Sequence, residues 1–118
     1  MKVLLDEDLD HRLRKSLSVH EVFTVRYLDW AGLKNGELLL AAEQSGIDVF
    51  VTGDQNLGYQ QNLDARRMAI VTLSATNWPI IRNHLTKIAA AIDRAVPGSV
   101  QALECGRFSR KRQQEPFE

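Results

Sequence analysis

The sequence is poor in the features that hold secreted and membrane proteins together. Cys105 is its single cysteine, which excludes an internal disulfide and fits a reducing compartment. No apolar stretch approaches the roughly 18 residues that a membrane-spanning helix needs. Strand-like sequence follows Met1 at once, without the charged and apolar regions of a signal peptide. We therefore expect a cytoplasmic protein with no membrane partner.

Net charge of either sign is also missing, since 15 basic residues balance 15 acidic ones. Any contact with a nucleic acid must therefore come from local patches or a bound metal rather than from bulk charge. The three histidines have no metal-ligand spacing with one another or with Cys105. Gly-rich phosphate loops and serine nucleophile elbows are absent as well, which removes several common enzyme classes.

What is present is an alternation of short apolar runs with helix-like segments. This alternation predicts a single α/β domain whose parallel sheet has helices on both faces. Strands are expected at residues 1–5, 21–25, 48–52 and 68–73, with a short edge strand at 99–103. Helices are expected around Leu13 and Leu17, from an N-cap at Asn35 to near Gly46, and from Trp78 to Ile92. The domain is expected to cover residues 1–108, followed by a flexible tail at 109–118.

Three carboxylates are expected to meet at one edge of this sheet. Asp6 follows the first apolar run, Asp54 follows the third, and Glu37 begins a helix. The carboxyl ends of parallel strands face the ligand crevice of an open sheet. Acids gathered there repel one another unless a positive group lies between them, and a hard cation such as Mg²⁺ is the simplest candidate. The pattern predicts a metal-dependent enzyme that acts on phosphate esters.

Each of these acids also has a purely structural interpretation. Asp8, which would bind the ion directly or through a water, is equally suited to capping a helix. Glu37 is favoured in a first helical turn by the helix dipole alone. Asp54 follows Gly53, a pairing that turns often use.

Four further residues are candidates for contact with the substrate. Asn56, Gln60 and Thr52 are placed to position a phosphate or a water. Arg12, on the first expected helix, is placed to follow an RNA backbone. Most surface amides and charges only interact with solvent, so both interpretations remain open for these residues.

Several segments of the chain together resemble a known family. Residues 2–9 (KVLLDEDL), 32–39 (GLKNGELL) and 51–57 (VTGDQNL) look like the compact PIN-like proteins of the DUF5615 group. The amide run at 59–63 (YQQNL) is similar to a signature found in part of that group. This group is related to PIN ribonucleases, which include the toxins of bacterial toxin–antitoxin pairs. The resemblance covers roughly residues 1–105.

The resemblance implies a PIN-like three-layer α/β/α sandwich with a small, mostly parallel sheet. It further implies an Mg²⁺- or Mn²⁺-dependent ribonuclease whose acidic roles fall to Asp6, Glu37 and Asp54. RNA and a cognate antitoxin protein are the partners that it implies, and exposed apolar surface would support a homodimer. Asn56 departs from the pattern, because many relatives have an aspartate there, and it lowers the negative charge of the site.

Two other functions remain open at this stage. A response-regulator receiver domain would use Asp54 as its phosphoacceptor, with Thr72 or Ser74 as the switch hydroxyl, but the sequence offers no lysine after its last strand. A catalytically degenerate PIN-like module would bind RNA or protein without metal-dependent turnover.

Overall fold

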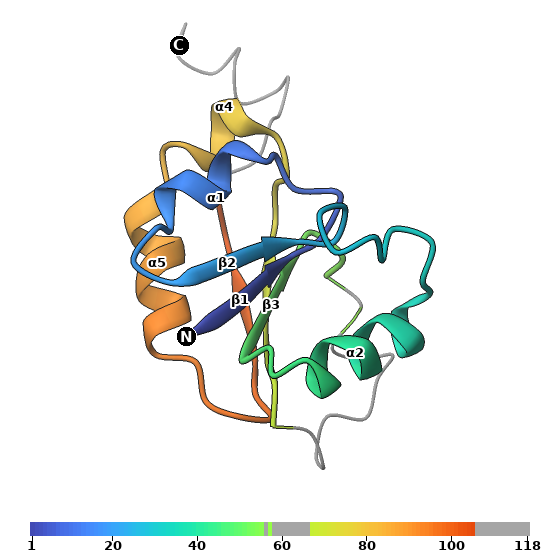
Figure 1. Ribbon diagram of the computed structural model, residues 1–118. Helices are drawn as coiled ribbons and strands as arrows, with labels where there is room; N and C mark the ends of the chain where they lie inside the picture. The colour runs from blue at the N-terminus through green and yellow to red at the C-terminus, as the bar shows by residue number, and fades with distance from the viewer. Residues whose placement is uncertain (56, 58–66, 106–118) are drawn as a thin grey trace, which may run out of the picture.

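The computed structural model describes residues 1–55, 57 and 67–105 of the chain (Figure 1). The predictions made for Asn56, Gln60 and the tail at 109–118 lie outside these residues. The strands are β1 (Lys2–Leu5), β2 (Glu21–Thr24), β3 (Val49–Thr52), β4 (Ala69–Leu73) and β5 (Val100–Leu103). The helices are α1 (Arg12–Ser16), α2 (Asn35–Gln44), α4 (Trp78–Ile81) and α5 (Leu85–Asp93).

The five strands form one sheet in the order β2-β1-β3-β4-β5. Every described strand pair is parallel, so the sheet is more regular than the mostly parallel one expected from the sequence. In the register, Leu5 lies beside Val51, and Thr52 lies beside Thr72. β1 and β3 are therefore adjacent inner strands, and β5 is an edge strand as predicted.

Helices cover both faces of the sheet, because successive strand residues point to opposite sides. On one face, Val3 and Leu5 belong to a core that also contains residues of α1, α4 and α5. On the other face, Leu4 and Phe50 pack in a second core with residues of α2. The result is an α/β fold with three layers, in which α2 lies apart from the other helices (Figure 1).

Helix α2 ends as the sequence predicts but begins one residue earlier than expected. Its N-cap is Lys34, whose backbone N–H donates to the Glu37 carboxylate at 3.5 Å, so the prediction of Asn35 as the N-cap is wrong. At the other end, Gly46 has a φ of +81°. The N–H groups of Gly46 and Ile47 bond the carbonyls of Glu43 and Ala42 at 3.1 and 3.0 Å. This pair of bonds is a Schellman cap, which needs a left-handed residue at the glycine position.

The single helix expected from Trp78 to Ile92 is wrong, because the structure contains two helices separated by a turn. The backbone N–H groups of Asn83 and His84 bond the carbonyls three residues before them, at 3.1 and 2.8 Å. The Asn83 side-chain amide donates to the Pro79 carbonyl at 3.3 Å and so takes the acceptor that a continuing helix would use. The apolar spacing extends across this break, which is why the sequence pattern does not reveal it.

No helix among the described residues is both long enough and apolar enough to cross a membrane.

Candidate functional site

The candidate site lies beyond the carboxyl ends of the adjacent strands β1 and β3, where the chain leaves the two strands in opposite directions across the sheet. The chain passes from β1 to β2 on one side and from β3 to β4 on the other. In open parallel sheets, such a reversal leaves a crevice beyond the carboxyl ends of the strands, and ligands bind there. Asp6 directly follows β1, and Asp54 lies two residues after β3. The backbone N–H of Asp6 donates to the Val51 carbonyl at 2.9 Å, which ties the end of β1 to β3.

A pocket of about 230 Å³ occupies this position. Its polar wall consists of Asp6, Glu7, Asp8 and Asp54. Its apolar wall consists of Val25, Trp30, Ala31, Leu33 and Leu38. No lysine, arginine or histidine is among the described residues that line it. The sequence prediction that Asp6 and Asp54 face a common crevice is therefore matched by the structure, and Asp8 joins them.

Thr52 connects the two principal carboxylate positions. Its hydroxyl donates to Asp6 Oδ2 at 2.7 Å and accepts the backbone N–H of Asp54 at 3.0 Å. The residue is fully buried, so the structure places its hydroxyl behind the acids. The positioning of a phosphate or a water by Thr52 stays a prediction, and its two hydrogen bonds show that the hydroxyl holds Asp6 and the turn at Asp54. A hydroxyl bonded to a ligating carboxylate fixes its orientation.

Asp8 faces the strand end rather than capping α1. Its Oδ1 accepts the Gly53 N–H at 3.4 Å. Partial burial raises the pKa of the Asp8 carboxyl above its ordinary value, and the negative charges of Asp6 and Asp54 raise it further. The Gly53 N–H opposes this shift without cancelling it. A cation in the pocket would oppose both causes, because it would favour the charged form of Asp8.

Gly53 is needed for the close approach of these segments. A Cβ at this position would collide with Thr76 Cγ2 and would lie 2.8 Å from Asp8 Oδ2. A side chain at this position would force Thr76 and Asp8 to move, so glycine suits the turn after β3. The sequence indicates this turn by a succession of three residues at the end of a buried strand: the hydroxyl residue Thr52, then Gly53, then the acid Asp54.

Glu37 lies outside the group of acids that line the pocket. It is exposed in the first turn of α2, where its carboxylate accepts the Lys34 N–H. Its neighbour Leu38 is the α2 residue that reaches the pocket wall. The metal or catalytic role of Glu37 therefore stays a prediction, and the bond to Lys34 accounts for its position structurally.

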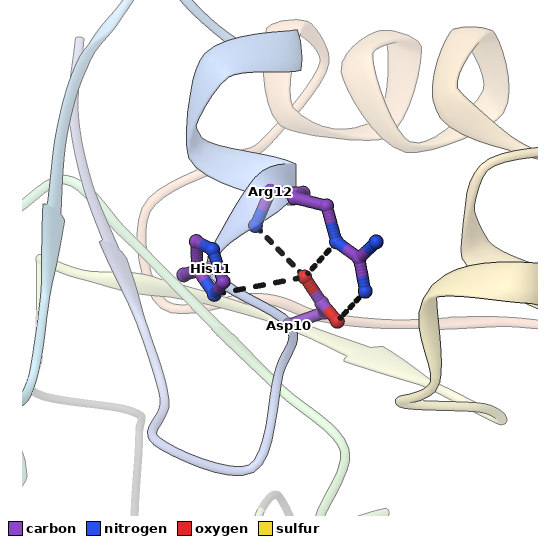
Figure 2. A network of polar contacts seen from close by, with 3 residues as sticks. All are labelled: Asp10, His11 and Arg12. Carbon is purple, nitrogen blue, oxygen red and sulfur yellow. Dashed lines mark hydrogen bonds and ion pairs between the residues drawn. The ribbon is translucent and has the colours of Figure 1, made fainter.

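Arg12 and Asp10 form a separate polar group next to the acidic segment (Figure 2). The Arg12 guanidinium donates to both Asp10 carboxylate oxygens, at 2.9 and 2.8 Å, and lies 5.2 Å from the centre of the Trp78 ring. The Arg12 backbone N–H adds a further bond to Asp10 at 2.9 Å. These bonds from Arg12 hold the pKa of the Asp10 carboxyl far below its usual range. Contact between Arg12 and RNA remains a prediction, and it would have to compete with this pairing.

The donor set suits a hard divalent cation in chemistry, although it does not form a complete coordination shell. Carboxylate oxygens are the ligands that Mg²⁺ and Mn²⁺ prefer. Among the described residues, no group of three or more His, Cys, Asp or Glu side chains is arranged to hold a metal ion. Mg²⁺ commonly keeps several waters and uses one or two protein carboxylates together with substrate phosphate. Asp6 and Asp54, with Asp8 beside them, fit that partial shell.

Comparisons with known proteins do not assign this arrangement to a family. No family model matches the sequence, and no significant match is found among curated proteins or among solved structures.

Proposed function

We propose that this protein is an Mg²⁺- or Mn²⁺-dependent ribonuclease that hydrolyses RNA phosphodiester bonds in the pocket between β1 and β3. The observation that supports this most directly is the pocket beyond the carboxyl ends of β1 and β3, whose polar wall consists of Asp6, Glu7, Asp8 and Asp54. Carboxylates gathered at the wall of one pocket are typical of sites that bind a cation.

In this proposal, Asp6 and Asp54 hold the ion, and Thr52 keeps the Asp6 carboxylate in the required orientation. When bound, a divalent cation lowers the pKa of a nearby water and offsets negative charge on a phosphate. Asp8 would accept a proton more readily than an ordinary carboxylate, since its pKa is raised by burial and by the neighbouring charges. The apolar wall containing Trp30 and Leu33 limits the access of bulk water from one side.

RNA as the substrate, and the PIN-like family itself, rest on the sequence resemblance. The same resemblance supports a role as the toxin of a toxin–antitoxin pair, with a cognate antitoxin as its protein partner. A small reading frame beside the gene is the first place to look for that partner. A homodimer is also proposed, and exposed apolar residues such as Leu40 and Val100 offer surfaces for it.

Cleavage of a mixed single-stranded RNA pool tests the proposal. The purified protein is compared in Mg²⁺, Mn²⁺ and EDTA, beside the variants Asp6→Asn and Asp54→Asn. Asp93→Asn is the matched control, because it removes an exposed carboxylate that pairs with His20 and lines neither this pocket nor its neighbour. We expect metal-dependent cleavage that both pocket variants reduce by more than about 100-fold, beyond the usual loss when an outer partner of a metal ligand is removed.

The other outcomes are equally informative. A folded wild-type protein without cleavage would favour a binding module that has lost catalysis, and RNA binding unchanged by Asp54→Asn would strengthen that interpretation. Equal cleavage by the wild type and all three variants would indicate a contaminating nuclease and would be followed by repurification.

A phosphoacceptor domain of the receiver type is the second candidate. The order β2-β1-β3-β4-β5, with Asp54 following β3, is the flavodoxin-like order that receiver domains also use. In addition, Lys87 of α5 donates to the backbone carbonyl of Glu104, just after β5, so a lysine does reach this edge of the sheet. Labelling of Asp54 by acetyl phosphate in Mg²⁺, absent in Asp54→Asn, would favour this function over RNA hydrolysis.

A further inference from the structure

A second pocket shares a wall with the acidic one. It has a volume of about 360 Å³ and lies beyond the carboxyl ends of β1 and β2. Asp6 and Glu7 line both pockets. The remaining lining residues are Leu5, Leu9, Asp10, His11, Thr24 and Arg26. A ligand in this second pocket would therefore lie beside the candidate metal ligands.

Three acids, Asp6, Glu7 and Asp10, line the second pocket together with one arginine, Arg26. Asp10 is already bonded to Arg12 through both carboxylate oxygens, which offsets its negative charge (Figure 2). Arg26 forms no ion pair within the described part of the chain, and its side chain is available to a ligand. His11 is exposed at the rim and lies 3.9 Å from Asp10. A free guanidinium offers the planar pair of donors that suits a phosphate group.

The floor of the second pocket is apolar. Leu5 is 1% exposed and Leu9 is 7% exposed, so both side chains belong to the core and present only a small surface. Thr24 adds a hydroxyl, whose oxygen accepts the Tyr27 N–H at 3.0 Å and whose own proton is available to donate. An apolar floor with a few polar groups at its rim, in a volume of this size, is typical of small-ligand sites.

We propose that this second pocket binds one nucleotide unit of the substrate, with its phosphate on Arg26 and its base or sugar against Leu9 and Thr24. The inference rests on the proposed function and adds a substrate-binding subsite to it. Binding there would direct the next phosphodiester bond of the RNA toward Asp6, which lines both pockets.

Titration with adenosine 5′-monophosphate in EDTA tests this subsite without any need for metal or catalysis. Binding is followed by amide chemical shifts in NMR, and we expect the largest changes near Leu9, Thr24 and Arg26. Arg26→Gln should weaken binding by about tenfold or more, as expected for the loss of a hydrogen-bonded charge. The matched control is Arg94→Gln, an exposed arginine just after α5. Its neighbour Asp93 pairs with His20, which immediately precedes β2. Arg94 therefore lies near the amino ends of the strands, away from the second pocket.

The results separate this subsite from the nuclease proposal. The subsite is overturned if the nucleotide does not bind, if Arg26→Gln binds it as well as the wild type, or if inorganic phosphate binds equally well. The last result would mean that the apolar floor contributes nothing. Nucleotide binding through Arg26 in a protein that does not cleave RNA would reject the nuclease proposal and leave the subsite standing. Metal-dependent RNA cleavage without nucleotide binding would do the reverse.

Discussion

Asp8 and Asp10 lie two residues apart in one acidic segment, yet their surroundings act on them in opposite directions. The pKa of Asp8 is raised by burial and by the neighbouring charges of Asp6 and Asp54. The pKa of Asp10 is lowered by hydrogen bonds from Arg12. Asp10 is thus stabilised within the protein itself, whereas Asp8 lies in a pocket whose described wall offers no cationic side chain.

This difference distinguishes a carboxylate that stabilises the fold from carboxylates that are placed to bind a ligand. A carboxylate whose partner comes from the same short segment needs nothing from outside the protein. Carboxylates that repel one another in a pocket store an unfavourable interaction, and a cation or a proton relieves it. Four experiments test this difference between Asp8 and Asp10.

The first experiment replaces the hydroxyl that connects the acids. Thr52→Val removes the donor to Asp6 and the acceptor for the Asp54 N–H while nearly preserving side-chain shape. We expect metal-dependent RNA cleavage to fall by about 10–100-fold, the usual effect of losing a group that orients a metal ligand. Thr72→Val is the control, since Thr72 is equally buried and lies beside Thr52 on β4. Similar losses in the two variants would show that Thr52 acts only through stability.

The second experiment fills the space between Asp8 and the end of β3. Gly53→Ala introduces a methyl group where Thr76 and Asp8 leave no room. We expect the free energy of unfolding to fall by about 1–3 kcal/mol, as for other overpacked positions. Gly32→Ala provides the control, because a Cβ there meets nothing within 4 Å. Urea denaturation of both variants measures the difference. Equal stabilities would show that the close approach of Gly53 to Asp8 and Thr76 does not constrain the fold.

The third experiment removes the charge of Asp8. Because folding raises its pKa above the ordinary 3.8, the ionised carboxylate destabilises the folded state once the pH exceeds that raised value. Asp8→Asn should therefore increase stability at neutral pH by less than about 1 kcal/mol, since solvent screens a charge that is only partly buried. The gain should disappear below pH 3.8, where the wild-type carboxyl is protonated in both states. Adding Mg²⁺ should stabilise the wild type more than the variant in thermal unfolding.

The fourth experiment makes the matching change at Asp10 and should show the opposite sign. Its folded pKa is lowered, so its contribution to stability is present above the ordinary 3.8 and is lost as the pH falls. Asp10→Asn should lower the melting temperature slightly at neutral pH, and the gap should close on acidification. Mg²⁺ should shift this variant as much as it shifts the wild type. If Asp8→Asn and Asp10→Asn gave the same pH profile, the distinction between the two acids would be wrong.

The sequence predicts the strands well because each one is a short apolar run with clear limits. The run at 68–73, for example, contains β4 with all five of its residues buried. The order of the strands is another matter, since single-sequence patterns contain no record of which runs become neighbours. The turn between α4 and α5 was hidden because apolar spacing extends across it, while the Asn83 bond to Pro79 acts locally.

The candidate site also follows from the sequence only in part. Asp6 and Asp54 were predictable because parallel strands bring their carboxyl ends to one edge. Glu37 depends on the path of the chain between β2 and α2, which the sequence pattern does not describe. The two hydrogen bonds of Thr52 do not follow from the sequence, because a buried threonine in a strand looks like an ordinary core residue until its partners are known.

The bond between Thr52 and Asp6 joins residues that are 46 positions apart in the chain. Contacts of such long range form only after a large loop has closed, and they tend to slow folding. The acidic pocket therefore exists only once β1 and β3 are paired, and a partly folded chain contains the carboxylates without the pocket. A divalent cation that binds this pocket would stabilise only the folded chain, so metal-dependent protection against unfolding would report on the completed sheet.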